Sequence, residues 1–355
     1  MQPFFSIVMP AYNAERYIEQ AILSIQNQTY SDWEFIIVDD ASQDTTSEIV
    51  QRYAAQDTRI RLHTRSQNGG VSMARNSGMK EAKGRYLWIA DADDYAEPNL
   101  LEIVHQSLQE NPAQYVVFGL IEEYYNEKEE FLYSHSISHK QGYYRTPEEL
   151  RKEIITLEQK TLYGYTWNKM YEVAHIRTLG LEFEVDKLID DILFNIAYAM
   201  DIQSMNVIDQ CMYHYGKRIQ QNLTNEFTPD YYKFHRKRIE KMWEQMKYWG
   251  EDTEETKAIL GALYGRYILS TLQRNCDKRA QMNLTARKAW CKKLYKDELY
   301  NTLIPSGRAE DSTALRIFLW LLRNKCTLAC LGMGRIVQVV RTGLPQLYSK
   351  TKSKR

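Results

Sequence analysis

The sequence predicts an α/β fold in residues 1–225, with a mostly parallel sheet flanked by helices, followed by a helical C-terminal region over residues 226–355. Two observations support this prediction. Short apolar runs alternate with segments of helical periodicity over the first 120 residues, as in sheets that are covered on both faces. From about Pro229 onward, the helical period continues with few strand signals.

The predicted elements follow in a regular order along the chain. We assign strands to five apolar runs, at residues 6–10, 34–38, 60–62, 86–90 and 115–119. Helices are expected over residues 14–28, 44–53, 71–82, after Pro98, and over 148–157 and 188–200. Residues 122–146 are polar and rich in Tyr and Glu, which indicates a hairpin or loop, and residues 213–224 are expected to be irregular.

The composition argues against several classes of protein. Lys plus Arg and Asp plus Glu number 46 each, and a net charge of zero argues against a nucleic-acid partner. The sequence contains no run of 18 apolar residues, so it predicts no transmembrane helix. The first residues lack the features of a signal peptide. The five cysteines include no CxxC motif, which indicates a reducing compartment. We therefore expect a cytoplasmic protein.

Three of the predicted strands end in polar or acidic residues, at positions 10–12, 39–40 and 91–94. Ligands of such sheets bind at the carboxyl ends of the strands, so these residues mark the predicted site. Neighbouring carboxylates raise one another's pKa unless a cation joins them, and oxygen ligands suit Mg²⁺ or Mn²⁺. Asp91, Asp93 and Asp94 are therefore either a metal site or a solvated acidic turn. Their place after a buried strand favours the metal.

Tyr12, Asp40 and Arg75 are candidates for binding a nucleotide. A tyrosine ring can stack on a base and a carboxylate can accept a hydrogen bond from it, although both residues could serve only the turns. Arg75 follows a Gly-Gly pair at 69–70, where backbone can approach a ligand closely. It could contact a diphosphate or simply pair with a surface acid.

Four motifs in this order resemble those of family 2 glycosyltransferases of the A-type (GT-A) fold that build bacterial surface polysaccharides. They are SIVMPAYN at 6–13, VDDASQD at 38–44, NGGVSMARN at 68–76 and ADADDY at 90–95. The resemblance covers roughly the first 220 residues. It implies a Rossmann-like sheet, a UDP-sugar donor, Mn²⁺ or Mg²⁺, and inversion at the anomeric carbon.

The resemblance also implies roles for individual residues. Tyr12 and Asp40 would contact the base, Asp91 would reach the ribose or the metal, and Asp93 would bind the metal directly. The remaining candidates for binding the nucleotide-sugar are Pro10, Arg75 and Asp94.

The general base is expected further along the chain. An inverting transfer is a single in-line displacement, so a carboxylate must take the proton of the acceptor hydroxyl. The family places this base in a Glu-Asp pair that opens a helix. Here the pair is Asp190-Asp191, and Asp191 is the predicted base. A purely structural alternative exists, because acids in a first helical turn favour the macrodipole.

Trp167, Lys169 and Asp190 are the candidates on the acceptor side. The tryptophan face suits a sugar ring, but a buried core indole explains it equally well. His214 lies where many such enzymes close a loop over the diphosphate. It is either an additional metal ligand or an ordinary hydrogen-bonded histidine.

The end of the chain is basic. Residues 312–355 contain nine Lys and Arg and no Asp or Glu, interleaved with Phe318 and Trp320. This pattern is typical of a helix that lies in the interface of an anionic membrane. A bundle helix or a homo-oligomer interface with a disordered tail is the alternative. We therefore expect a cytoplasmic protein, peripheral on the inner face of the membrane.

The predicted function is transfer of a hexosyl or N-acetylhexosaminyl group from a UDP-sugar to an acceptor hydroxyl in exopolysaccharide, capsule or other surface-glycan synthesis. The expected acceptor is a glycan or a lipid-linked oligosaccharide. A nicotinamide oxidoreductase is excluded, because no GxGxxG pattern follows the first strand. A nucleotidyltransferase and a catalytically silent nucleotide-sugar-binding subunit remain as alternatives.

Overall fold

The computed structural model describes residues 2–185, 188–218, 227–310 and 312–343. The chain divides into two compact units, Met1–Asn225 and Glu226–Arg355.

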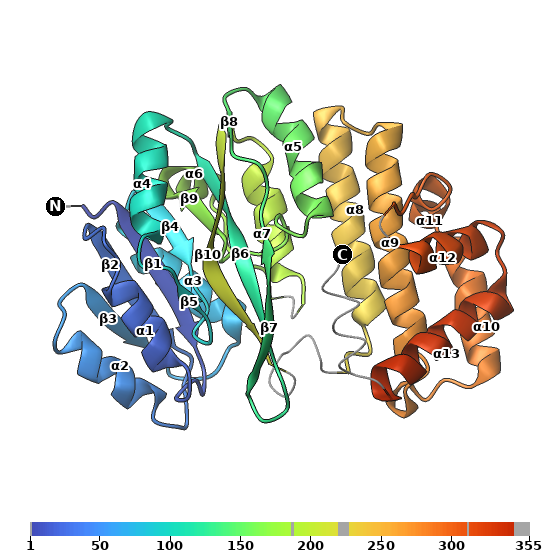
Figure 1. The fold of residues 1–355 in the computed structure, drawn as a ribbon, viewed down its shortest axis with the longest axis horizontal. Helices are drawn as coiled ribbons and strands as arrows, with labels where there is room; N and C mark the ends of the chain where they lie inside the picture. Colours follow the sequence, from blue (N-terminus) through green and yellow to red (C-terminus); the bar gives the residue numbers. More distant parts are fainter. Residues whose placement is uncertain (1, 186–187, 219–226, 311, 344–355) are drawn as a thin grey trace. The chain divides into compact units, whose positions relative to one another are not determined.

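The first unit is built on a ten-stranded sheet, counted over the described residues, with the order β3-β2-β1-β4-β9-β6-β10-β5; β7 pairs with β6, and β8 with β10 (Figure 1). The strands are β1 (Phe5–Ala11), β2 (Trp33–Asp39), β3 (Ile60–Thr64), β4 (Tyr86–Ile89), β5 (Tyr95–Ala96), β6 (Tyr115–Tyr125), β7 (Phe131–Ile137), β8 (Gly142–Tyr144), β9 (Lys169–Glu172) and β10 (Met205–Lys217). The flanking helices are α1 (Ile18–Gln26), α2 (Thr46–Ala54), α3 (Val71–Glu81), α4 (Leu100–Glu110), α5 (Pro147–Gln159), α6 (Val173–Leu179) and α7 (Asp190–Ala199).

The predicted α/β class with a mostly parallel central sheet is confirmed. β1 pairs in parallel with β2 and β4, β2 with β3, and β6 with β10. β1 is buried along its whole length because helices cover the sheet. α3 packs so closely on β1 that a Cβ at Gly78 would lie 2.4 Å from Cγ1 of Val8. This close packing carries the N-terminal turns of α3 to the carboxyl edge of the sheet.

One sequence expectation about the elements needs correction. Of residues 213–224, which were expected to be irregular, 213–217 form the end of β10, where Tyr213 pairs with both Ala96 of β5 and Leu120 of β6, and 219–224 lie outside the described residues. Register shifts between Ile208 and Tyr213 interrupt the alternation of side chains, which hid this strand. β9 and α6 were also not anticipated. The excursion at 122–146 is indeed a hairpin, formed by the end of β6 with β7.

The second unit is helical over its described residues. Its elements are α8 (Tyr231–Trp249), α9 (Glu254–Arg274), the 3₁₀ helix η2 (Lys278–Ala280), α10 (Leu284–Leu294), α11 (Glu298–Leu303), α12 (Thr313–Arg323) and α13 (Thr327–Gly343). α9 packs against α8, α11, α12 and α13. Across the residues described, no helix is long and apolar enough to cross a lipid bilayer.

Candidate active site

The turns after β1 and β2 are joined by hydrogen bonds. Asn13 has a left-handed backbone (φ 49°), its N–H donates to the Ser42 hydroxyl at 3.0 Å, and its side-chain oxygen accepts from the Gln43 N–H at 2.8 Å. Asp39 accepts from the Ser42 N–H at 3.1 Å. A polar hollow of about 320 Å³ lies at these turns, lined by Asn13, Glu15, Arg16, Tyr17, Gln43 and Asp44.

Pro10 and Tyr12, both predicted at the nucleotide, lie differently. Pro10 is buried in β1, where it pairs with Val38 of β2. Tyr12 lies just beyond the strand and is 48% exposed. An exposed ring at a strand end can stack on a planar base, so the structure leaves this predicted role open to Tyr12.

Asp40 is buried and organises the loop that leads into α3. Its carboxylate accepts from the Gly69 N–H at 3.1 Å and the Gly70 N–H at 2.7 Å, and it pairs with Arg65. Gly70 has a φ of 85°, which other residues adopt with strain, and α3 begins directly after it. Arg65 was not singled out from the sequence. The contact of Asp40 with a base remains a prediction.

The three carboxylates of the acidic turn after β4 have different surroundings. The Asp91 N–H donates to the Tyr213 hydroxyl at 3.1 Å, and the carboxylate of Asp91 is partly buried. Asp94 is buried: its Oδ1 accepts from the Gly216 N–H at 2.8 Å, and its Oδ2 has no hydrogen-bond partner among the described residues. The Asp93 side chain, by contrast, is 43% exposed.

Burial raises the pKa of all three acids. It raises the pKa of Asp91 to about 7, with Arg75 opposing the rise and Asp191 and Asp93 adding to it. Burial, and then the charges of Asp93 and Asp91, raise the pKa of Asp94 well above its ordinary value. The surrounding protein also removes water from part of Asp93 and raises the pKa of this more exposed acid, with Arg218 opposing the rise. The turn therefore resists carrying three negative charges by itself, and a cation would relieve this.

The donors at this turn fit a hard divalent cation. They are carboxylate oxygens, which Mg²⁺ and Mn²⁺ prefer; Asp93 is accessible, and Asp94 Oδ2 is buried without a partner. Within the described ranges, no three His, Cys, Asp or Glu side chains are arranged to hold a metal by themselves. Mg²⁺ usually keeps several waters and substrate phosphates as ligands, so one or two carboxylates suffice. The metal remains a prediction.

Arg75 joins the acidic turn to the start of α7. Its Nη1 lies 2.9 Å from Asp190 Oδ2 and also contacts Asp191, and its Nη2 lies 3.3 Å from Asp91 Oδ1. Burial lowers the pKa of Arg75, but the three carboxylates outweigh it and raise the pKa above its ordinary value. Arg75 is 4% exposed, so it is no surface ion pair. It links the acidic turn to the acid pair that opens α7, which the sequence places about a hundred residues apart.

The two acids that open α7 are not equivalent. Asp190 accepts from the Ser72 hydroxyl at 3.0 Å, and only 9% of its side chain is exposed, against 24% for Asp191. Burial and the charge of Asp191 raise the pKa of Asp190 to about 6, with Arg75 opposing. Asp191 is thus the more accessible carboxylate, as a group that meets an acceptor must be. Ser72 was missed, although it lies one helical turn before Arg75.

Trp167 and Lys169 are part of the core. Trp167 is 2% exposed and stacks on Tyr165 and Tyr213, with ring centroids 4.5 and 4.7 Å apart. Trp167 is therefore a buried core indole, and its ring has no exposed face on which a sugar could stack. Lys169 is fully buried and donates to the Leu162 carbonyl at 2.7 Å and to Asn168 Oδ1 at 2.6 Å. These bonds fix the loop before β9 rather than contact an acceptor.

His214 has both ring nitrogens occupied. Nδ1 lies 2.9 Å from Glu123 Oε1 and Nε2 lies 2.8 Å from Glu97 Oε1, while the ring stacks on Tyr95 at 4.2 Å. His214 is therefore an ordinary hydrogen-bonded histidine in this structure, because neither ring nitrogen is left to bind a metal. Arg218 of the same segment instead reaches the acidic turn, since its Nη1 donates to the Asp93 carbonyl at 2.9 Å.

The sheet with its helices and the acids at its carboxyl edge define a GT-A fold. Residues 6–179 match the model of the family described as Glycosyl transferase family 2. The chain is 29% identical over 216 residues to the uncharacterized glycosyltransferase EpsJ of Bacillus subtilis (strain 168), covering 61% of each chain. It is 38% identical over 126 residues to the glycosyltransferase GlyG of Streptococcus pneumoniae serotype 4 (strain ATCC BAA-334 / TIGR4), covering 36% of this chain and 40% of GlyG.

Solved structures agree on the fold. Residues 1–349 of S. aureus TarS in complex with UDP-GlcNAc superpose with a TM-score of 0.63 at 21% identity, covering 96% of this chain and 92% of that one. The first unit thus carries a glycosyltransferase family 2 domain over residues 6–179. It spans 61% of the length of EpsJ and 40% of that of GlyG.

Proposed function

We propose that this protein is an inverting glycosyltransferase that moves a hexosyl or N-acetylhexosaminyl group from a UDP-sugar to an acceptor hydroxyl. The observation that carries the proposal is the buried Arg75, which brings Asp91 of the acidic turn and Asp190 and Asp191 of α7 into one cluster. The acid proposed on the donor side and the accessible carboxylate proposed as base therefore share one guanidinium, which is compatible with a single displacement. The TarS complex with UDP-GlcNAc, which shares the fold, supports a UDP-sugar as donor.

The residues of the chain suggest a division of labour. Asp191 takes the proton of the acceptor hydroxyl while the oxygen of that hydroxyl attacks the anomeric carbon. The bond from that carbon to the diphosphate breaks, and UDP leaves with the electron pair. Asp93, with Asp91, would hold Mn²⁺ or Mg²⁺, which when bound offsets the charge that develops on the diphosphate. Tyr12 and Asp40 would contact the nucleobase, and Pro10 and Asp94 are further proposed contacts of the nucleotide-sugar.

The acceptor we propose is a glycan or lipid-linked oligosaccharide of a cell-surface polysaccharide, in line with the family whose model matches residues 6–179. Such an acceptor would place the enzyme in the cytoplasm at the inner face of the membrane. No nucleic acid is expected as a partner.

Measuring UDP release by the full-length protein tests this function. We expect one member of a panel of UDP-sugars to release UDP in the presence of Mn²⁺, faster when an acceptor is added. Release of pyrophosphate from UTP and a sugar 1-phosphate, offered together in a parallel reaction, would instead identify a nucleotidyltransferase. Binding of UDP-sugars without release under every condition would identify a silent subunit. NMR of the product anomer tests inversion.

A further inference from the structure

The last part of the chain carries a large excess of positive charge. Residues 278–355 contain 17 Lys and Arg and four Asp and Glu, whereas the whole chain has 46 of each kind. The preceding 277 residues therefore carry the opposite excess. A separation of this size indicates that the C-terminal helices meet an anionic partner.

α12 and α13 expose apolar side chains among these charges. On α12, Ile317 is 52% and Trp320 58% exposed, and their spacing of three residues places them on one face of the helix. Phe318, which the sequence pattern groups with Trp320, is fully buried and cannot contribute to a surface. On α13, a second apolar row is more than half exposed and consists of Leu328, Ile336 and Val339.

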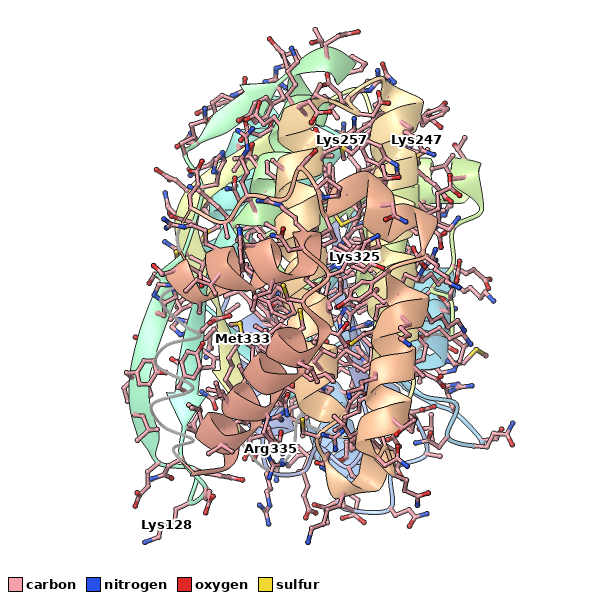
Figure 2. The ribbon with its side chains drawn as sticks, turned by 90° about the vertical axis from the view of Figure 1, so that its right-hand side faces the viewer. Lys128, Lys247, Lys257, Lys325, Met333 and Arg335 are labelled. Carbon is pink, nitrogen blue, oxygen red and sulfur yellow. The ribbon has the colours of Figure 1, made fainter. Side chains whose placement is uncertain are left out.

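Basic side chains lie next to both rows. Arg316 precedes Ile317 and is exposed, Lys325 is exposed in the link between the two helices, and Arg335 precedes Ile336. Of these basic residues, Lys325 and Arg335 are labelled in Figure 2, together with Met333 of α13. Helix α10, which packs against α13, adds the exposed Lys292 and Lys293.

We infer that these exposed residues form one surface, the α12–α13 face, that binds an anionic lipid bilayer without crossing it. The face is made of Arg316, Ile317, Trp320, Lys325, Leu328, Arg335, Ile336 and Val339. The inference rests on the membrane location proposed above and is independent of the transfer reaction.

A bilayer explains both properties of the face, and other occupants explain only one. A second copy seated symmetrically on the same face would bring its own basic residues against these. A soluble polyanion would neutralise the arginines and lysines but would leave five large apolar side chains in water. Anionic headgroups neutralise the charges, and the acyl boundary buries the apolar rows.

Point variants are the right test, because α12 and α13 cannot be deleted cleanly. Their removal would expose α9: Leu315, Phe318, Leu319 and Leu322 of α12 are buried, and a Cβ at Gly265 of α9 would lie 2.6 Å from Leu319 Cδ2. The full-length chain should therefore be compared with single variants by flotation on phosphatidylglycerol–phosphatidylcholine vesicles and on pure phosphatidylcholine vesicles at low salt.

We expect binding to the anionic vesicles only, and weaker binding as salt is added. Trp320→Ser should weaken it roughly tenfold, as for returning one large apolar side chain to water. The matched control is Phe131→Ser, which removes an aromatic side chain of similar exposure, 56%, from β7. Arg335→Gln should weaken binding roughly fivefold, whereas Lys247→Gln on α8 should not.

Three results would overturn the inference. The full chain could ignore anionic vesicles at low salt, Trp320→Ser could dissociate an oligomer without changing vesicle binding, or Trp320→Ser and Phe131→Ser could bind equally well. UDP release, measured in parallel, should be the same in Trp320→Ser and the parent. A protein that binds vesicles but never releases UDP would refute the proposed function and leave this inference standing.

Discussion

The turn after β2 and the acidic turn after β4 look alike in the sequence but differ in the folded chain. Asp39 and Asp40 are surrounded by donors from Ser42, Ser47 and the backbone of residues 69–70. Around the turn after β4, burial outweighs the available donors and raises the pKa of its acids. The acids of the first turn therefore stabilise the conformation of the neighbouring loops by accepting hydrogen bonds. The second keeps acids in an unfavourable state, as sites for cations and proton transfer often do.

The largest effect should come from breaking the link between the acidic turn and the acid pair that opens α7. Arg75→Gln leaves buried carboxylates without their counter-charge, which should lower the free energy of unfolding by about 3–5 kcal/mol at pH 8. The loss should be smaller at pH 5, because Asp91 and Asp190, with pKa values of about 7 and about 6, are then protonated. Urea denaturation at the two pH values measures this.

Arg75→Lys should recover only part of the lost stability, since one ammonium cannot form the forked contacts of a guanidinium. An equal loss at both pH values would show that Arg75 acts through packing rather than through charge.

The next effect concerns the base. Asp191→Asn should lower turnover by at least ~10²-fold, or about 2.7 kcal/mol, with little change in the affinity for the donor. Steady-state rates and donor titrations separate the two quantities. Asp209→Asn, at an exposed position of β10, is the control and should behave like the parent. A collapse of donor affinity with turnover intact would make Asp191 a structural cap of α7.

The smallest effect links pH to the cation. Because the pKa of Asp91 is raised in the folded state, the folded protein binds more protons than the unfolded chain between pH ~4 and ~7, and stability should fall as pH rises. Mn²⁺ at ten times its Kd should restore about 1.4 kcal/mol at pH 8 and less at pH 5, where protons compete. Thermal melts with and without Mn²⁺ test this.

Asp40→Asn sharpens the same comparison. It should lower the melting temperature at both pH values, because Asp40 receives the N–H groups of residues 69–70, and it should leave the Mn²⁺ effect unchanged. A Mn²⁺ effect that is independent of pH, or that disappears in Asp40→Asn, would remove the distinction between the two turns.

The fold was predictable where local pattern agrees with tertiary structure. The buried runs that form β1, β2 and β4 are continuous apolar stretches, so the amino-acid pattern by itself aligns the ends of these strands. β10 was not recognised from the sequence because its register shifts break the pattern that a period of two requires. β9 was hidden because its first residue is Lys169, whose burial depends on carbonyls of the preceding loop.

The site was predictable as a set of acids but not as a network. Strand ends indicate Asp91, Asp93 and Asp94 as candidates, and the resemblance to the family indicates Asp191. No local signal says that Arg75 reaches α7, since that contact joins segments 116 residues apart. The same holds for Trp167 and His214, whose neighbours in space decide between a ligand site and a core position.

The central claim is that the acidic turn after β4 works as a cation site for a UDP-sugar. Titration of UDP into the parent and into Asp93→Asn, with Mn²⁺ and then with excess chelator, tests it most directly. We expect Mn²⁺ to strengthen UDP binding by the parent and to have no effect in Asp93→Asn, which should also have lost transfer. Full transfer activity of the parent in excess chelator, with UDP affinity unchanged, would contradict it.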